Sequence, residues 1–123
     1  PNGAVMLLKS DGTNTSKAIT EKGYFTVTSS AITAFTAVAG DQLLVDTTQT
    51  TVTITLPASP AVGDEVFFVD ARGTFASNAL TIERNGQPIN SGTNNLALSS
   101  NGQAITLVYI DSTRGWAYKT NTA

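Results

Sequence analysis

The sequence predicts an all-β protein, folded as an antiparallel β-sandwich or a small jelly-roll-like barrel. Three observations carry this prediction. Short apolar or alternating segments recur roughly every ten residues, and turn-forming residues separate them. Twenty of the 123 residues are threonine, whose β-branched side chain favours strands. Short strands at this spacing are typical of sandwiches and barrels rather than of alternating strands and helices.

The first strands lie in an N-terminal segment. The apolar run at 4–9 is short enough for a strand. A strand near a chain end can join its own sheet or pair with the edge of a neighbouring copy. Residues 23–28 alternate between apolar and polar side chains, which predicts a second strand. Residues 30–39 repeat alanine at a helical spacing but are rich in β-branched side chains, so we assign a strand there too.

Gly40 marks a change in the pattern, and we use it to divide the chain. Residues 1–40 are predicted to form an N-terminal arm, and residues 41–123 a β-sandwich module. The strands expected in this module are 43–46, 51–56, 65–70, 79–84, 96–98, 104–110 and 116–119. Asn85-Gly86 predicts a type I′ hairpin turn, because both residues tolerate a positive φ. Residues 87–90 would form the return arm at a sheet edge, since Pro88 cannot donate a backbone hydrogen bond.

Two of these strands carry apolar side chains on both faces. In 65–70 and 104–110 the alternation of apolar and polar residues breaks down, so each strand has apolar side chains on both faces. One thin sheet covers only one of these sides, and we therefore expect copies of the chain to associate. The candidate subunit-interface residues are Val66, Phe67, Phe68, Val69, Ile105, Leu107, Val108 and Ile110.

Composition narrows the classes of function. Charged residues make up only 13% of the chain, about half the usual share, which suits a surface of neutral polar groups or one partly covered by other chains. The net charge is −2, and the seven basic residues are scattered, so no nucleic-acid partner is expected. With no cysteine or histidine, disulfides and the usual zinc sites are excluded. No apolar run is long enough for a membrane span. Pro1 fits removal of an initiator methionine, from which we expect a whole small gene product.

From Leu56 onwards, an ordered set of turn and strand motifs resembles a known family. The motifs are Leu56-Pro57, Pro60, Gly63-Asp64, Gly73-Thr74-Phe75, Asn78, Leu80-Thr81-Ile82, Arg84-Asn85-Gly86, Ile89-Asn90, Leu107-Val108-Tyr109, Asp111 and Thr113-Arg114-Gly115-Trp116. Their succession is similar to the β-structured modules of tail fibres, head fibres and capsid-decorating proteins of tailed bacteriophages. The resemblance covers about residues 41–119.

The resemblance implies a non-enzymatic, homotrimeric virion component. Separately, we expect no cofactor and no metal. A compact module without a fibre shaft or coiled-coil heptads suits a capsid decoration (cement) protein, made in the host cytoplasm and located on the capsid surface. Its partner would be the major capsid protein. The candidate attachment residues are Val5, Met6, Leu7 and Leu8. The alternative is a tail-fibre or head-fibre tip that binds a host-surface polysaccharide or receptor.

For that alternative, Arg114, Trp116 and Tyr118 are the candidate glycan contacts, because an arginine beside aromatic rings can form a sugar-binding platform. The competing interpretation is that Trp116 anchors the core and Arg114 pairs with Asp111 across a turn. Thr51, Thr53 and Thr55 form a flat polar strand face. This face could bind a glycan or an ice-like surface, although a solvent-facing or subunit-contact role is favoured.

The carboxylates give little support for catalysis or metal binding. Asp64 and Glu65 are adjacent, and neighbours on a strand point to opposite faces, so they cannot converge as a glycosidase requires. The other candidates each lie beside a turn, where aspartate is expected. These are Asp41, Asp46, Asp70 and Asp111. A calcium site built from two of them stays open, but the spacing of a calcium loop is missing around Asp11.

Overall fold

The computed structural model describes residues 7–10, 16–19 and 23–122, and this part of the chain contains strands and no helix. The all-β prediction is therefore confirmed. The strands are β1 (Leu7–Ser10), β2 (Ser16–Ile19), β3 (Tyr24–Thr28), β4 (Ala34–Thr36), β5 (Gln42–Asp46), β6 (Val52–Thr55), β7 (Glu65–Asp70), β8 (Leu80–Glu83), β9 (Leu96–Leu98), β10 (Ala104–Asp111) and β11 (Gly115–Thr122).

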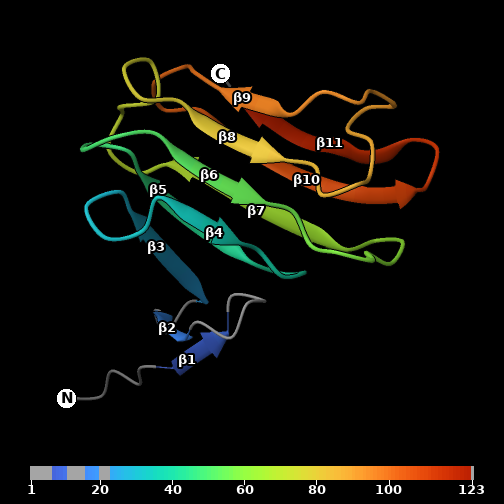
Figure 1. Ribbon diagram of the computed structural model, residues 1–123, viewed down its shortest axis with the longest axis horizontal. Coiled ribbons are helices and arrows are strands. Elements are labelled where there is room, and N and C mark those ends of the chain that lie inside the picture. The colour runs from blue at the N-terminus through green and yellow to red at the C-terminus, as the bar shows by residue number, and fades with distance from the viewer. Residues whose placement is uncertain (1–6, 11–15, 20–22, 123) are drawn as a thin grey trace.

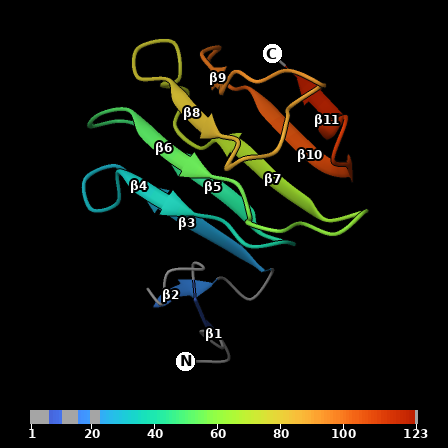
Figure 2. The same ribbon diagram turned by 45° about the vertical axis from the view of Figure 1, so that its right-hand side comes forward.

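Two larger sheets form the body of the molecule. One has five strands in the order β11-β10-β7-β5-β3, and the other has four in the order β4-β6-β8-β9. They lie one behind the other in Figures 1 and 2, as in a sandwich. β1 and β2 form a separate two-stranded sheet, which lies beyond the end of β3 in both views.

Between β3 and β8 the chain winds as a flat coil. Each successive strand belongs to the opposite sheet, so β3–β4, β5–β6 and β7–β8 are three turns stacked side by side. Within each sheet the stacked strands run parallel: Phe25 pairs with Leu43 in one sheet, and Phe35 with Ile54 in the other. β9, β10 and β11 then close the last turn with antiparallel pairs.

This topology corrects two expectations. The sheets are mixed rather than antiparallel, because parallel pairs join β3, β5 and β7 in one sheet and β4, β6 and β8 in the other. The division at Gly40 is not a structural boundary either. β3 and β4 precede it, yet each pairs in register with a strand that follows it, so the sandwich includes residues assigned to the N-terminal arm.

Strand positions follow the predicted pattern closely, except that β2 was not predicted and the predicted return arm at 87–90 is not a strand. Asn85 and Gly86 have φ of 51° and 86°, as the type I′ turn requires. However, the strand that pairs with β8 after this turn is β9, not the predicted return arm at 87–90. In that segment Ile89 makes isolated bridges with Gly92 and Trp116 and is buried over the end of the core.

The core fills the space between the two sheets. Alternate residues of each strand point inward, which is the period expected of half-buried strands. At the first turn of the coil, Phe25 from β3 stacks on Phe35 from β4 with ring centroids 5.6 Å apart. At the opposite end, Trp116 is completely buried beside Tyr109. The core is therefore bounded at both ends by aromatic side chains.

Candidate functional site

The outer faces of the two sheets differ in chemistry. On the five-stranded sheet, a group of half-buried, mainly apolar side chains points away from the core, with Thr26, Gln42 and Glu65 beside them, and the described strands place no layer over this group. We call this surface the apolar face. It consists of Tyr24, Leu44, Phe67, Val69, Ala104, Thr106, Val108 and Ala117.

Strand register brings these side chains together. Phe67 of β7 lies opposite Thr106 of β10, and one step along, Val69 lies between Leu44 and Ala104. The ring of Tyr24 meets the ring of Phe67 edge-on, with centroids 6.3 Å apart. The apolar face thus crosses at least four strands, with the polar side chain of Gln42 between Tyr24 and Phe67 in the register.

The four-stranded sheet presents a threonine face instead. Thr53 pairs with Thr81, and Thr55 pairs with both Thr36 and Glu83, all on the side away from the core. The Thr55 hydroxyl donates a hydrogen bond of 3.3 Å to the Glu83 carboxylate. Short polar side chains of this kind are suited to water, so one outer face of the molecule is built for solvent and the other is not.

The predicted subunit interface divides into two halves by strand parity. Val66, Phe68, Ile105 and Leu107 are 0% exposed inside the chain's own core, so they cannot contact another copy in this fold. Of the remaining four residues, Phe67, Val69 and Val108 lie on the apolar face, and Ile110 is 42% exposed beyond it. Sequence reasoning missed Tyr24 and Leu44, although the doublet Leu43-Leu44 breaks alternation just as Phe67-Phe68 does.

A cavity of about 280 Å³ opens at one end of the apolar face. Its lining combines two aromatic rings with polar and acidic groups. The lining residues are Tyr24, Gly40, Asp41, Gln42, Glu65, Phe67 and Thr106. At its rim, Lys119 donates hydrogen bonds to both carboxylate oxygens of Glu65, at 3.0 and 3.2 Å. The charges of Glu65 and Lys119 at this edge of the apolar face therefore neutralise each other.

Of the three predicted glycan contacts, Arg114 and Tyr118 are exposed, whereas Trp116 is not available to a ligand. Trp116 is 0% exposed and packs edge-on against Tyr109, so its ring cannot contact a sugar. Its Nε1 has no hydrogen-bond partner within the described ranges. Arg114 is exposed, and it contacts Asp111 through its backbone rather than its side chain. The backbone N–H of Arg114 donates a hydrogen bond of 2.7 Å to the Asp111 carboxylate. The core-anchor interpretation of Trp116 is the one that agrees with the structure.

The adjacent carboxylates Asp64 and Glu65 face different surroundings. Asp64 accepts the N–H of Ala61 at 2.9 Å and lines a second cavity of about 300 Å³, whereas Glu65 lies at the rim of the first. They do not converge on one cleft. Within the part of the chain that the structure describes, no group of three or more acidic side chains is arranged to hold a metal ion.

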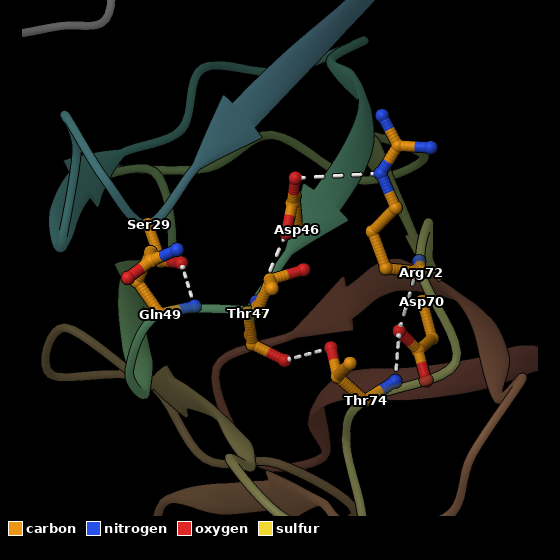
Figure 3. Close-up of polar contacts among 8 residues, drawn as sticks. Ser29, Asp46, Thr47, Gln49, Asp70, Arg72 and Thr74 are labelled. Carbon is orange, nitrogen blue, oxygen red and sulfur yellow. Dashed lines mark hydrogen bonds and ion pairs between the residues drawn. The ribbon is translucent and has the colours of Figure 1, made fainter.

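Buried polar residues gather at one corner of the coil, where β5 and β7 end (Figure 3). The Thr47 and Thr74 hydroxyls lie 2.7 Å apart, and the Ser29 hydroxyl accepts the N–H of Gln49 at 2.9 Å. Asp46 accepts the N–H of Thr48, and hydrogen bonds from the side chain and backbone of Thr48 lower the pKa of the Asp46 carboxyl. These contacts tie successive turns of the coil together.

Asp70 is a buried hydrogen-bond acceptor in this cluster of polar residues. Its carboxylate is 7% exposed and accepts four backbone N–H groups, from Arg72, Thr74, Phe75 and Gly102. Burial by itself raises the pKa of Asp70, but the four hydrogen bonds outweigh it and the pKa is lowered. The aspartates at turns therefore organise backbone, which is the structural role expected of them.

The candidate attachment residues can be placed only in part. Val5 and Met6 lie outside the described residues, whereas Leu7 and Leu8 belong to β1, where they pair with Ile19 and Ala18 of β2.

Comparison with protein-family models found no match, and a search of curated proteins found none with significant similarity. Over the described ranges, no helix is long and apolar enough to cross a membrane.

Proposed function

We propose that the chain is a non-enzymatic structural protein of a tailed-bacteriophage virion, acting as a homotrimeric capsid decoration protein. It would lie on the capsid surface and bridge neighbouring copies of the major capsid protein. The observation that carries the proposal is the apolar face, a surface that the described strands of one copy leave uncovered. The virion location and the number three come from the resemblance to phage fibre and decoration modules.

The size of the apolar face fits a role in assembly. Five strands about 4.8 Å apart and about five residues long give the whole outer side of the sheet roughly 350 Å² in projection, and the apolar face occupies the central part of it. Apolar patches of a few hundred Å² on monomers are commonly interaction sites. A standard interface takes about 800 Å² from each partner, so the apolar face would form its centre and polar residues its rim.

The charge distribution favours a second copy as the occupant of this face. The centre of the face carries no charged side chain, and the Glu65–Lys119 pair at its edge is neutral as a unit. Two copies can therefore meet there without burying an unpaired charge, which would cost several kcal/mol.

Phe67→Glu tests the assembly step. A carboxylate at the centre of the contact should weaken self-association at least about 100-fold, because it would be buried without a partner. Thr53→Glu is the matched control, since Thr53 is also half-buried but lies on the threonine face. Sedimentation equilibrium at micromolar concentration measures both variants. A wild-type chain that stays monomeric, or a Phe67→Glu variant that assembles like wild type, would contradict the proposed interface.

The decoration role has its own test. Purified wild-type protein should rebind capsids stripped of it and raise their melting temperature, whereas Phe67→Glu should do neither at the same concentration. Failure of both by the wild-type protein would remove the capsid role while leaving self-association intact.

One observation favours the alternative of a fibre tip that binds host polysaccharide. The 280 Å³ cavity combines aromatic rings with amide and carboxylate groups, a lining suited to a sugar ring. Gln42→Ala should then abolish binding of host polysaccharide, and Arg114→Ala should leave binding unchanged. The opposite pattern would exclude this cavity as the glycan site.

A further inference from the structure

Among the described strands, β3 and β4 of the first turn of the coil are the last strands of their sheets. β3 is the edge strand of the five-stranded sheet and β4 is the edge strand of the four-stranded sheet, at the same end of the coil. An edge strand directs every second pair of backbone N–H and C=O groups away from its sheet. Such a row of groups is a template for a further strand.

The hydrogen bonds show which backbone groups point outward on β3. Ser29, one residue beyond β3, donates its N–H to the C=O of Asp46 at 2.9 Å, so Ser29 faces β5. Because backbone direction alternates along a strand, Val27 also faces β5, whereas Thr26 faces the open edge. The Thr26 side chain is exposed as well.

The same reasoning applies to β4. Ala37 donates its N–H to Thr55 at 2.9 Å, and Thr33 accepts the N–H of Thr53 at 2.9 Å. These residues face β6, so Thr36 between them faces away from it. Both sheets thus offer outward-facing backbone at this end.

β3 carries none of the devices that usually protect a sheet edge. Its five residues include no charge and no proline, and its parallel register with β5 runs without a bulge from Tyr24 to Thr28. β4, by contrast, is only three residues long, and short edges are poor templates. The β3 edge is therefore the better acceptor of the two.

β1 and β2 supply a matching donor. They pair with each other from Leu7↔Ile19 to Ser10↔Ser16 and, in the described ranges, with no strand of the larger sheets. A two-stranded sheet is at best marginally stable in water and needs a third strand or a packed partner. Figures 1 and 2 show this hairpin near the start of β3, and β2 contacts β3 without forming a ladder with it.

We propose that the β1–β2 hairpin of one copy adds to the β3 edge of a second copy, so that the five-stranded sheet continues across the subunit boundary. The four-residue strands of the hairpin are long enough for the β3 edge around Thr26. This edge ends at Thr28, where the carbonyl oxygen already accepts the N–H groups of Ala31 and Ile32. The added strand bonds outward-facing backbone of β3 such as that of Thr26. This strand exchange rests on the self-association proposed above and adds a second contact to it, separate from the apolar face.

Thr26→Pro tests the acceptor edge. Proline removes the N–H at position 26 and places its ring there, which blocks an incoming strand. The ladder between β3 and β5 keeps its hydrogen bonds because Thr26 does not face β5, and edge strands tolerate proline. Thr36→Pro is the matched control, with the same change on the outward-facing side of β4. We expect Thr26→Pro to weaken self-association about tenfold or more and Thr36→Pro to leave it unchanged.

Amide hydrogen exchange gives a readout that needs no substitution at the β3 edge. The Thr26 amide should exchange about tenfold or more slowly in the assembled protein than in the Phe67→Glu variant, while the Thr36 amide exchanges alike in both. If Thr26→Pro fails to fold, as judged by circular dichroism, this measurement decides the question alone.

Three outcomes would overturn the proposal. An unprotected Thr26 amide in the assembly would exclude strand addition at β3. Equal weakening by Thr26→Pro and Thr36→Pro would mean that the partner bonds both sheets, which a single hairpin cannot do. Dissociation by Phe67→Glu together with wild-type assembly of Thr26→Pro would leave the proposed function standing and remove only the strand exchange.

Discussion

Asp70→Asn is the substitution from which the structure predicts the sharpest loss of stability. Each oxygen of the buried Asp70 carboxylate accepts two backbone N–H groups: those of Arg72 and Thr74 at 3.3 and 3.1 Å, and those of Phe75 and Gly102 at 3.1 and 2.9 Å. Asparagine keeps the shape of the side chain but replaces one oxygen by an NH₂ group. Two N–H donors would then face another donor.

The expected loss of stability depends on which two N–H groups lose their acceptor. Hydrogen bonds to a charged group contribute about 1.5–3 kcal/mol each. The amide can rotate so that the oxygen serves Phe75 and Gly102, which leaves Arg72 and Thr74 unpaired. Arg72 is exposed, so water can replace part of its bond and the loss lies at the lower end. We expect the free energy of unfolding to fall by about 2–4 kcal/mol, a large part of the usual 5–15 kcal/mol.

Urea unfolding followed by fluorescence measures this loss, because Trp116 is the only tryptophan and is fully buried. Asp111→Asn is the control, since Asp111 is exposed and uses only Oδ1 to accept the N–H groups of Thr113 and Arg114. Asparagine can reproduce those bonds, so the change should stay within about 0.5 kcal/mol. Equal effects of the two substitutions would refute the argument from the buried cluster.

Two further predictions concern the pH dependence of stability and the steric room for a Cβ atom at two glycines. The pKa values of Asp46 and Asp70 are lowered in the folded state, so the stability they contribute is fully present above the unfolded pKa of about 3.9 and is lost as pH falls through the lower folded pKa. The midpoint of urea unfolding should therefore be constant from pH 5 to 7 and decrease below about pH 4. In Asp70→Asn this decrease at low pH should be smaller. A decrease as large as in the wild-type protein would contradict the prediction. Gly115→Ala should cost more than about 2 kcal/mol, because at φ 72° a Cβ would lie 1.8 Å from the carbonyl oxygen of Pro88. Gly102→Ala, at φ 78° with open space around it, should cost only about 1 kcal/mol, and comparable losses in the two variants would count against a steric cause.

Local pattern located most of the strands. The six residues of β7 match the predicted bounds 65–70, and alternation correctly separated Val66 and Phe68 from Phe67 and Val69. It could do so because the two-residue period is a property of the strand itself and does not depend on which partner the strand takes. The positive φ of Asn85 followed from residue type in the same way.

The interface and glycan predictions show that local sequence pattern does not determine which side chains are buried in the core. The sequence marked both faces of β7 and β10 as apolar, but only the fold placed Ile105 and Leu107 in the chain's own core and left Phe67 outside. Likewise, Arg114 and Trp116 are neighbours in sequence, yet the indole is buried and the arginine is exposed.

The sequence by itself determined that the chain forms strands, where most of them lie and which side chains share a face. Only the tertiary structure decided that these strands wind between two sheets with parallel neighbours, which sheet keeps an apolar outer face, and which edge stays open. The physical reason is that residues two apart in a strand point to the same face, so the alternation can be recognised within the strand itself. Strand pairing is set by contacts between residues such as Leu43 and Phe68, which are distant in the chain and whose apolar character suits a parallel or an antiparallel neighbour equally well.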